Sequence, residues 1–268
     1  MQSGGRLEAM AASPLDAARD AVAGARRIVA LTGAGISTDS GVPDFRGPQG
    51  VWTKNPAAEK SSTLQHYLAD TEVRKGVWRS RLDHPAFTAR PNAGHQSLVD
   101  LEQQGRLRAI VTQNIDELHQ RAGSSSDKVI ELHGTAHGWM CWSCGATGPM
   151  LEMLERVRAG EEDPPCAACG GIVKSTTISF GQSLDPAVLE RAERAVLDAD
   201  LILAVGSTLT VYPAAGFVPL GHAYGAQVVI VNAEPTPHDD LAVAVVRGSI
   251  SEALPVLVAQ HPGRPAPG

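Results

Sequence analysis

Residues Arg27-Ile-Val-Ala-Leu-Thr-Gly-Ala-Gly35 join a short apolar run directly to a glycine-rich turn. Residues 28–31 carry no polar side chain, which is typical of a strand buried on both faces of a parallel sheet. Glycines at positions 33 and 35 let the backbone approach a pyrophosphate closely, and a helix N-terminus beyond them supplies N–H donors. The stretch therefore predicts the first strand and the phosphate-binding turn of an α/β sheet.

Four more apolar runs repeat this pattern, and each ends in a glycine or polar turn; they are residues 107–112, 128–132, 201–205 and 227–231. Stretches with helical spacing lie between the runs, at residues 15–26, 94–104 and 186–198. Alternation of strands and helices predicts a doubly wound α/β fold with a parallel sheet.

Two segments interrupt this alternation. One is polar with helical patches, and the other contains all four cysteines, so we expect both to be insertions that together form a smaller lobe. The Pro- and Gly-rich C-terminus and the first residues are expected to be disordered. The predicted organisation is a sheet domain from residues 13–48, 92–135 and 174–258, a helical insertion at 49–91, a cysteine module at 136–173, and disordered ends at 1–12 and 259–268.

The composition excludes several classes of protein. With 268 residues, of which 43% are hydrophobic and 19% charged, the chain can bury a core without cross-links. A net charge of −6 and 4% aromatic residues argue against general binding of nucleic acid or an anionic membrane. Residues 1–27 carry charges throughout, and no run of 18 apolar residues occurs. We expect a cytoplasmic monomer that binds neither nucleic acid nor membrane.

The cysteines form two Cys-x-x-Cys pairs, Cys141 with Cys144 and Cys166 with Cys169. Two such knuckles close a tetrahedron of thiolates around one Zn²⁺, and four thiolates leave no open position, so the ion is expected to be structural. Gly145 and Gly170 follow each pair, where a knuckle turn often needs positive φ. The alternatives are buried thiols, a redox pair, or a zinc ribbon that binds nucleic acid or protein; the last does not explain the rest of the chain.

The glycine turn departs from the fingerprint of dinucleotide-binding dehydrogenases. Thr38 stands where the third glycine is usual, and no strand ending in an acidic residue follows about 20 residues later. A polar loop with Asp44, Phe45 and Arg46 follows instead. A hydride-transferring dehydrogenase is therefore the weaker hypothesis for this turn. A tight turn that binds no ligand is a further alternative.

Polar clusters follow four of the predicted strands where ligands gather in such sheets. They are Gln113-Asn114-Ile115-Asp116, His133-Gly134, Gly206-Ser207-Thr208 and Asn232-Ala233-Glu234. Any one cluster could be a simple turn. Together with the glycine turn they predict a crevice lined by amide, hydroxyl, carboxylate and imidazole groups.

These motifs, in this order, resemble the sirtuins. The resemblance rests on the stretch from Gly33 to Arg46, on Gln113-Asn-Ile-Asp116, on His133-Gly134, on the four cysteines, and on Gly206-Ser207 with Asn232. It extends from about residue 17 to about residue 257. Sirtuins are NAD-dependent protein lysine deacylases. The resemblance implies a Rossmann-type domain and a small lobe of a zinc module and a helical insert, with NAD and an acyl-lysine peptide meeting in the cleft between them.

The resemblance also implies the chemistry. The acyl oxygen of the substrate attacks C1′ of the nicotinamide ribose, and the products are nicotinamide, free lysine and an O-acyl-ADP-ribose. His133 is implied as the general base, with Asn114 and Asp116 as further catalytic residues and Asp116 on the carboxamide. The roles of His95 and His119 are expected to be structural.

Other residues are implied by matching motifs. The residues implied to face the phosphates and ribose are Gly33, Ala34, Gly35 and Thr38, and those implied to form a cofactor loop are Asp44, Phe45 and Arg46. The ribose and nicotinamide pocket is implied to be lined by Gln113, Asn114, Ile115 and Asp116. The adenosine half is implied to be held by Gly206, Ser207, Thr208, Asn232, Ala233, Glu234 and Ile250. Ile178, Ser179, Phe180 and Gly181 bind the peptide through main-chain pairing.

Some residues depart from the common sirtuin pattern. Gln182 ends a segment that usually reads Val-Val-x-Phe-Gly-Glu, and the Trp78-x-x-Arg81 pair is similar to the Tyr-x-x-Arg pair of desuccinylating members, although its spacing to Pro91 fits them poorly. Residues 74–81 and 235–242 look closer to class II sirtuins, which favours acyl groups beyond acetyl. Two alternative functions remain open: a protein mono-ADP-ribosyltransferase of this fold, and a non-catalytic zinc-bearing NAD-binding module.

Overall fold

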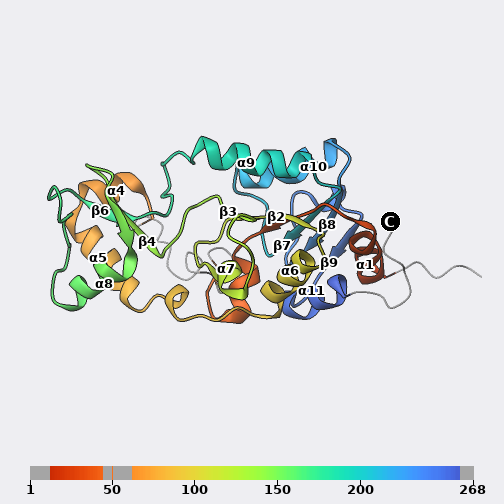
Figure 1. The fold of residues 1–268 in the computed structure, drawn as a ribbon, viewed down its shortest axis with the longest axis horizontal. Helices are drawn as coiled ribbons and strands as arrows, with labels where there is room; N and C mark the ends of the chain where they lie inside the picture. The colour runs from red at the N-terminus through yellow and green to blue at the C-terminus, as the bar shows by residue number, and fades with distance from the viewer. Residues whose placement is uncertain (1–12, 45–49, 51–61, 260–268) are drawn as a thin grey trace, which may run out of the picture.

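The computed structural model describes residues 13–44, 50 and 62–259 (Figure 1). The predictions of disorder for residues 1–12 and for residues 260–268 lie outside the described residues. So do the predictions made for Phe45 and Arg46 and for most of the first part of the helical insertion.

The larger lobe is built on six parallel strands in the order β3-β2-β1-β7-β8-β9. The strands are β1 (Ile28–Thr32), β2 (Leu107–Thr112), β3 (Val129–Glu131), β7 (Leu201–Val205), β8 (Gln227–Val231) and β9 (Ala244–Val246). From β1 the chain adds strands on one side as far as β3 and then returns to the other side of β1 with β7. This is the Rossmann order, and it puts a topological switch point between β1 and β7, where such sheets bind ligands. The predicted fold class is confirmed.

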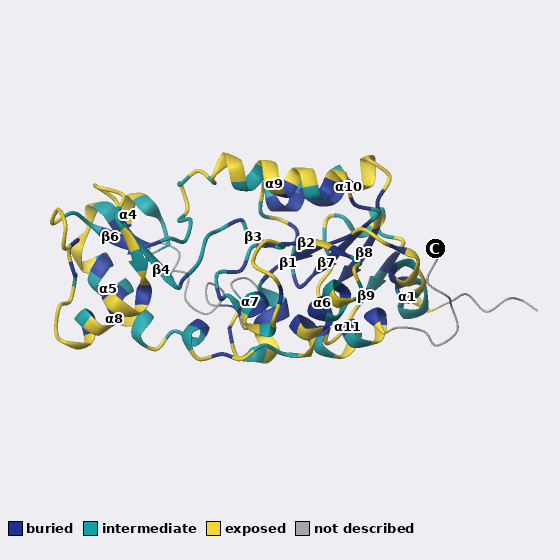
Figure 2. Ribbon diagram, in the orientation of Figure 1, coloured by how far each residue is buried: buried dark blue, intermediate teal, exposed yellow. Residues whose placement is uncertain are grey.

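The sheet is covered by helices on both faces because its strands are apolar on both faces. On β1, Ile28 and Ala30 pack in the core beneath α1 (Pro14–Gly24), α6 (Ala93–Gln103) and α11 (Ile250–Val258). Val29 and Leu31 pack in the opposite core, beneath α9 (Pro186–Leu197) and α10 (Phe217–Ala223). Figure 2 shows the sheet dark blue between these layers and the outer side of α9 exposed.

The helices begin where the sequence supplies capping groups. The Ser13 side chain accepts a hydrogen bond from the N–H of Asp16 at the start of α1, and the Asp185 side chain caps α9 in the same way. Both helices have proline at their first position, where the missing N–H costs nothing. Asn92 and His95 form a reciprocal capping box at the start of α6, which fixes this helix beside the glycine turn.

The smaller lobe has its own sheet and its own core. The antiparallel sheet has the order β5-β4-β6, with β4 (Gly138–Cys141), β5 (Thr147–Pro149) and β6 (Val173–Ser175). It packs with α4 (Leu64–Ala69), α5 (Thr71–Leu82) and α8 (Met150–Arg158) around Trp78, Met150 and Leu154. Because β6 continues to Ser175, the small sheet reaches two residues beyond the predicted boundary at 173.

A few short elements complete the described part of the chain. They are η1 (Ala34–Ser40), η2 (Pro85–Phe87), α7 (Leu118–Ala122), η3 (Ala214–Gly216) and η4 (Asp239–Leu241). Among the described residues, none of the helices combines the length and the apolar character needed to cross a membrane.

Candidate active site

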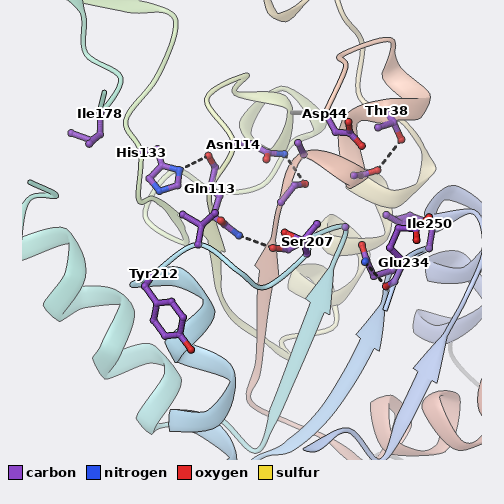
Figure 3. A pocket seen from close by; sticks show the side chains of 18 of the residues that line it. Thr38, Asp44, Gln113, Asn114, His133, Ile178, Ser207, Tyr212, Glu234 and Ile250 are labelled. Atoms are coloured by element: carbon purple, nitrogen blue, oxygen red, sulfur yellow. Dashed lines mark hydrogen bonds between the residues drawn. The ribbon is translucent and has the colours of Figure 1, made fainter. Parts of the chain in front are cut away.

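A cavity of about 500 Å³ opens at the carboxyl ends of β1, β7 and β8, beside the switch point (Figure 3). The three predicted glycine-turn and strand-end groups meet there: Gly33, Ala34, Gly35, Thr38 and Asp44; Gln113, Asn114 and His133; and Gly206, Ser207 and Thr208. The predicted adenosine and peptide residues line it as well: Asn232, Ala233, Glu234 and Ile250; and Ile178, Ser179, Phe180 and Gly181. These residues follow the ends of all six strands of the large sheet or belong to the segment that leaves the small lobe.

The floor of the cavity is formed by two backbones in direct contact. The N–H of Gly33 donates to the Val205 carbonyl at 3.0 Å, and the N–H of Gly35 donates to the Gly206 carbonyl at 2.8 Å. A Cβ atom on Gly33 would lie 2.7 Å from the Gly206 oxygen, and one on Gly206 would lie 2.4 Å from the nitrogen of Ile36. Only glycine fits at these positions, so the turn after β1 and the turn after β7 form one surface of bare backbone.

His133 is held in one orientation at the edge of the cavity. Its Nδ1 lies 3.0 Å from the main-chain oxygen of Gln113, which can only accept, so Nδ1 carries the proton (Figure 3). In the neutral ring, Nε2 is then unprotonated and able to accept a proton. Burial holds the pKa of His133 below its usual range, against the opposing effect of the Gln113 carbonyl. The ring is therefore a neutral base near neutral pH.

Amide side chains tie the centre of the cavity together. Gln113 Nε2 donates to Ser207 Oγ at 2.9 Å, which joins the end of β2 to the turn after β7. Asn114 Nδ2 donates to the Gly33 carbonyl at 3.1 Å and to Ser37 Oγ at 3.2 Å. These bonds leave the Asn114 side-chain oxygen as the acceptor that this residue can offer to a ligand.

Two of the predicted ligand residues lie behind the cavity wall. Asp116 is only 3% exposed; its carboxylate accepts hydrogen bonds from Ser37 Oγ at 2.7 Å and from the Leu118 N–H at 3.0 Å. Ile115 likewise does not line the cavity, and its carbonyl accepts from the Ala136 N–H. Asp116 is connected to the cavity by two successive hydrogen bonds, because Ser37 Oγ donates to its carboxylate and accepts from Asn114 Nδ2. Phe45 and Arg46 lie outside the described residues.

A pair of buried histidines underlies this network. Their rings are 5.1 Å apart; His95 is bonded to Asn92, and His119 Nε2 lies 3.0 Å from Thr32 Oγ1. Burial lowers the pKa of His95 to about 4 and that of His119 to about 3, so both rings are neutral near pH 7. Neither residue lines the cavity, in agreement with the structural role expected for them.

The peptide-binding segment proposed from the sequence runs from the small lobe along the cavity. The N–H of Ile178 donates to the His133 carbonyl at 2.8 Å. Phe180 pairs through both its main-chain groups with Ser62 and Leu64. Successive residues of an extended chain point their N–H and C=O groups to opposite edges, so Ser179 faces the other edge, where the Gln182 side chain accepts its N–H at 3.3 Å.

Several residues that line the cavity were missed by sequence reasoning. Asp39, Gln182, Leu184, Val211, Tyr212, Gly248 and Ser249 are among them. Val211 and Tyr212 lie in the loop that follows the predicted strand 201–205, so extension of that cluster by a few residues would have included them. Gly248 and Ser249 follow β9, and the apolar run at residues 241–246, which contains this strand, would have pointed to them.

The four cysteine side chains converge at the edge of the small sheet. Their sulfur atoms all lie within 4.8 Å of one another, with 3.5 Å between Cys141 and Cys169 and 3.7 Å between Cys144 and Cys166. Four thiolates at about 2.3 Å from a zinc ion are roughly 3.8 Å apart, so the set fits tetrahedral Zn²⁺. All four are free of disulfides. Gly145 and Gly170 have φ of 72° and 71°, which confirms the predicted knuckle turns.

Several proteins of similar sequence are named NAD-dependent protein deacetylase. An NAD-dependent protein deacetylase 2 of Streptomyces coelicolor is 49% identical over 231 residues, which cover 86% of this chain and 96% of that protein. An NAD-dependent protein deacetylase 1 of Bradyrhizobium diazoefficiens is 42% identical over 237 residues, which cover 88% of this chain and 91% of that protein.

Solved structures of Sir2 enzymes share the fold. One, described under the structural basis for the mechanism and regulation of Sir2 enzymes, has a TM-score of 0.83 at 37% identity and covers 93% of this chain and 97% of its own. A Sir2 complex with a p53 peptide and NAD⁺ has a TM-score of 0.78 at 34% identity, covering 88% and 93%. A model of the Sir2 family matches residues 33–213. The resemblance seen in the sequence is thus confirmed, and the chain belongs to the Sir2 family, the sirtuins.

Proposed function

We propose that this protein removes acyl groups from lysine side chains of proteins and consumes NAD as a co-substrate. The observation that carries the proposal is the cavity in which the His133 ring, the bare backbone of the glycine turns and the Ile178–Gly181 segment meet. The deacetylase names of the relatives support the same activity. When bound, NAD supplies an ADP-ribosyl group with nicotinamide as the leaving group, and the acyl group ends on that ribose.

His133 acts as the general base in this proposal. Its Nε2 accepts a proton from a ribose hydroxyl, because Nδ1 is already committed to the Gln113 carbonyl. The hydroxyl oxygen that loses this proton would bond to the acyl carbon, and the lysine nitrogen would leave with a proton. One water molecule would be consumed, so that the O-acyl-ADP-ribose carries a hydroxyl on C1′. The lowered pKa keeps the base unprotonated at neutral pH.

Asn114 is proposed to contact the ligand directly, and Asp116 is proposed to orient Asn114 from behind the cavity wall. Asn114 offers its side-chain oxygen to a ribose hydroxyl or an ordered water. The Asp116 carboxylate accepts a hydrogen bond from the Ser37 hydroxyl, which orients Ser37 Oγ to accept one from Asn114. In this arrangement Asp116 fixes the orientation of the Asn114 amide, and its carboxylate remains desolvated behind the wall.

The substrate peptide is proposed to pair with the edge of Ile178–Gly181 that Ser62 and Leu64 do not occupy. Main-chain pairing gives affinity without a fixed sequence, and it would displace the Gln182 side chain from the Ser179 N–H. Ile178, Leu184 and Val211 give this side of the cavity an apolar lining. Such a lining suits an uncharged acyl group, including chains longer than acetyl.

Cys141, Cys144, Cys166 and Cys169 are proposed to hold one structural zinc ion. The ion would fix the two knuckles that frame the small sheet, and it supplies no open position for a substrate. Thiolates bind zinc only in the reduced state, which agrees with the predicted cytoplasmic location.

The test incubates the purified protein with NAD and peptides that are identical except for the lysine modification: acetyl, propionyl, butyryl, long-chain acyl and lipoyl. Mass spectrometry then measures free lysine peptide, nicotinamide and O-acyl-ADP-ribose. We expect these three products in equal amounts for at least one acyl group. Labelled protein with nicotinamide but without acyl-ADP-ribose would replace the proposal by mono-ADP-ribosylation. Binding of NAD without release of nicotinamide would reduce the protein to a binding module.

A further inference from the structure

The adenosine end of the cavity is formed by two backbone segments that follow neighbouring strands. Asn232, Ala233 and Glu234 follow β8, and Gly248, Ser249 and Ile250 follow β9. Neither segment belongs to a strand. The Asn232 N–H donates to the Val246 carbonyl of β9 at 3.2 Å, and Asn232 Nδ2 donates to the Glu234 carbonyl at 2.8 Å. Further bonds from outside the sheet also hold these segments. A side chain that fixes residues 232–234 relative to residues 248–250 would therefore set the shape of this end of the cavity.

Arg247 connects the two segments. Its Nη1 donates to the carbonyl oxygens of Asn232 at 2.8 Å and Glu234 at 2.7 Å. Its Nη2 pairs with the carboxylate of Asp239, which also accepts the Thr236 hydroxyl at 2.7 Å. One guanidinium therefore bonds to the first and last residues of the tripeptide 232–234, and its ion pair with Asp239 fixes it to the loop that follows this tripeptide.

Arg247 does this from outside the cavity. It does not line the cavity, whereas the residue after it, Gly248, does. Gly248 has φ of 133°, a conformation that glycine adopts without strain, and this turns the chain from Arg247 into the cavity wall. The planar guanidinium of arginine can donate from two nitrogens to three acceptors at fixed angles. A lysine ammonium has a single nitrogen and cannot make the same set of hydrogen bonds.

We propose that Arg247 is a positioning residue that sets the adenosine end of the NAD site by clamping residues 232–234 to the turn at 248–250. This rests on the proposed use of NAD. It adds a determinant of cofactor affinity that lies outside the motifs of the glycine turn and the strand ends. Removal of the clamp should weaken binding of the adenosine half and leave the chemistry at His133 unaffected.

The experiment measures binding of ADP-ribose by isothermal titration calorimetry, because ADP-ribose carries the adenosine half and is not turned over. We expect Arg247→Ala to weaken ADP-ribose binding about tenfold, or about 1.4 kcal/mol. The KM for NAD should rise by a similar factor, while kcat at saturating NAD and the KM for the acyl-peptide stay within about twofold of wild type. The matched control is Arg194→Ala, which breaks an exposed ion pair with Glu190 on α9 and should change none of these values.

Two milder variants separate the clamp from simple charge. Arg247→Lys keeps the charge but offers one nitrogen, and should fall between wild type and Arg247→Ala. Asp239→Asn keeps both carbonyl bonds and should weaken binding less than Arg247→Lys. Wild-type affinity in Arg247→Ala or Arg247→Lys would overturn the proposal, as would a larger loss in Asp239→Asn than in Arg247→Lys. Because ADP-ribose binding needs no turnover, failure of the proposed deacylation would leave this test intact.

Discussion

The contact between the two glycine turns gives a prediction whose size can be worked from the structure. Gly206 has φ of 63°, and a Cβ atom there would lie 2.4 Å from the Ile36 nitrogen and 2.7 Å from the Gly35 carbonyl carbon. Gly225 has φ of 94° with nothing within 4 Å of the same atom. Alanine at either position costs about 1–2 kcal/mol for the left-handed backbone. Only Gly206→Ala adds a clash with rigid backbone, about 1–3 kcal/mol more.

The assay compares thermal unfolding of Gly206→Ala and Gly225→Ala. At roughly 2–4 °C per kcal/mol for a domain of this size, Gly206→Ala should melt about 2–12 °C below Gly225→Ala. It should also bind NAD at least about tenfold more weakly, because relief of the clash moves the turn at Gly33 and Gly35 that forms the cavity floor. Gly225→Ala should bind NAD as wild type does. Equal melting temperatures with equal NAD affinities would refute the close approach of the two turns.

Three further predictions concern the base, the zinc site and the buried histidines. His133→Ala should abolish acyl transfer with an unchanged circular dichroism spectrum. In the wild type, kcat/KM should fall as the pH drops through the pKa of His133, which burial places below 6.5, and a midpoint above 6.5 would contradict this. Elemental analysis should find one zinc per chain in the wild type and none in Cys141→Ser, whereas Ser143→Ala in the same knuckle should keep the ion. Because the unfolded chain takes up a proton near pH 6.5 and buried His119 only near pH 3, stability should fall from pH 6.5 to pH 4 by about 3 kcal/mol for this residue. His119→Gln, which can still bond to Thr32, should lessen that pH dependence of the melting temperature, and an unchanged dependence would rule His119 out as its source.

The sequence was sufficient for the parts of this protein that depend on local chemistry. The run at residues 28–31 was recognised as a buried strand because every side chain in it is apolar, and Gly33 and Gly35 marked the turn that follows it. The helical stretches predicted at residues 15–26 and 186–198 correspond to α1 and α9. The spacing of the two Cys-x-x-Cys pairs was enough to predict that four thiolates converge, as they do for Cys141, Cys144, Cys166 and Cys169.

Other features were invisible because they arise between segments far apart in the chain. The parallel pairing of β9 with β8 is what brings the turn at residues 248–250 to the cavity. Arg247 has no motif of its own, and its role depends on carbonyls that are 13 and 15 residues away. Asp116 looks like a ligand residue in its motif, yet Ser37, 79 residues away, holds its carboxylate behind the wall.

The sequence by itself therefore determined the family, five of the six strands and three of the helices of the sheet lobe, and the chemical groups that serve the site. The tertiary structure alone decided which of those groups face the cavity, which nitrogen of His133 is free, and what holds the adenosine end. The physical reason is that side-chain type and backbone propensity are local properties, whereas exposure and hydrogen-bond partners are set by which strand ends meet at the switch point of the sheet.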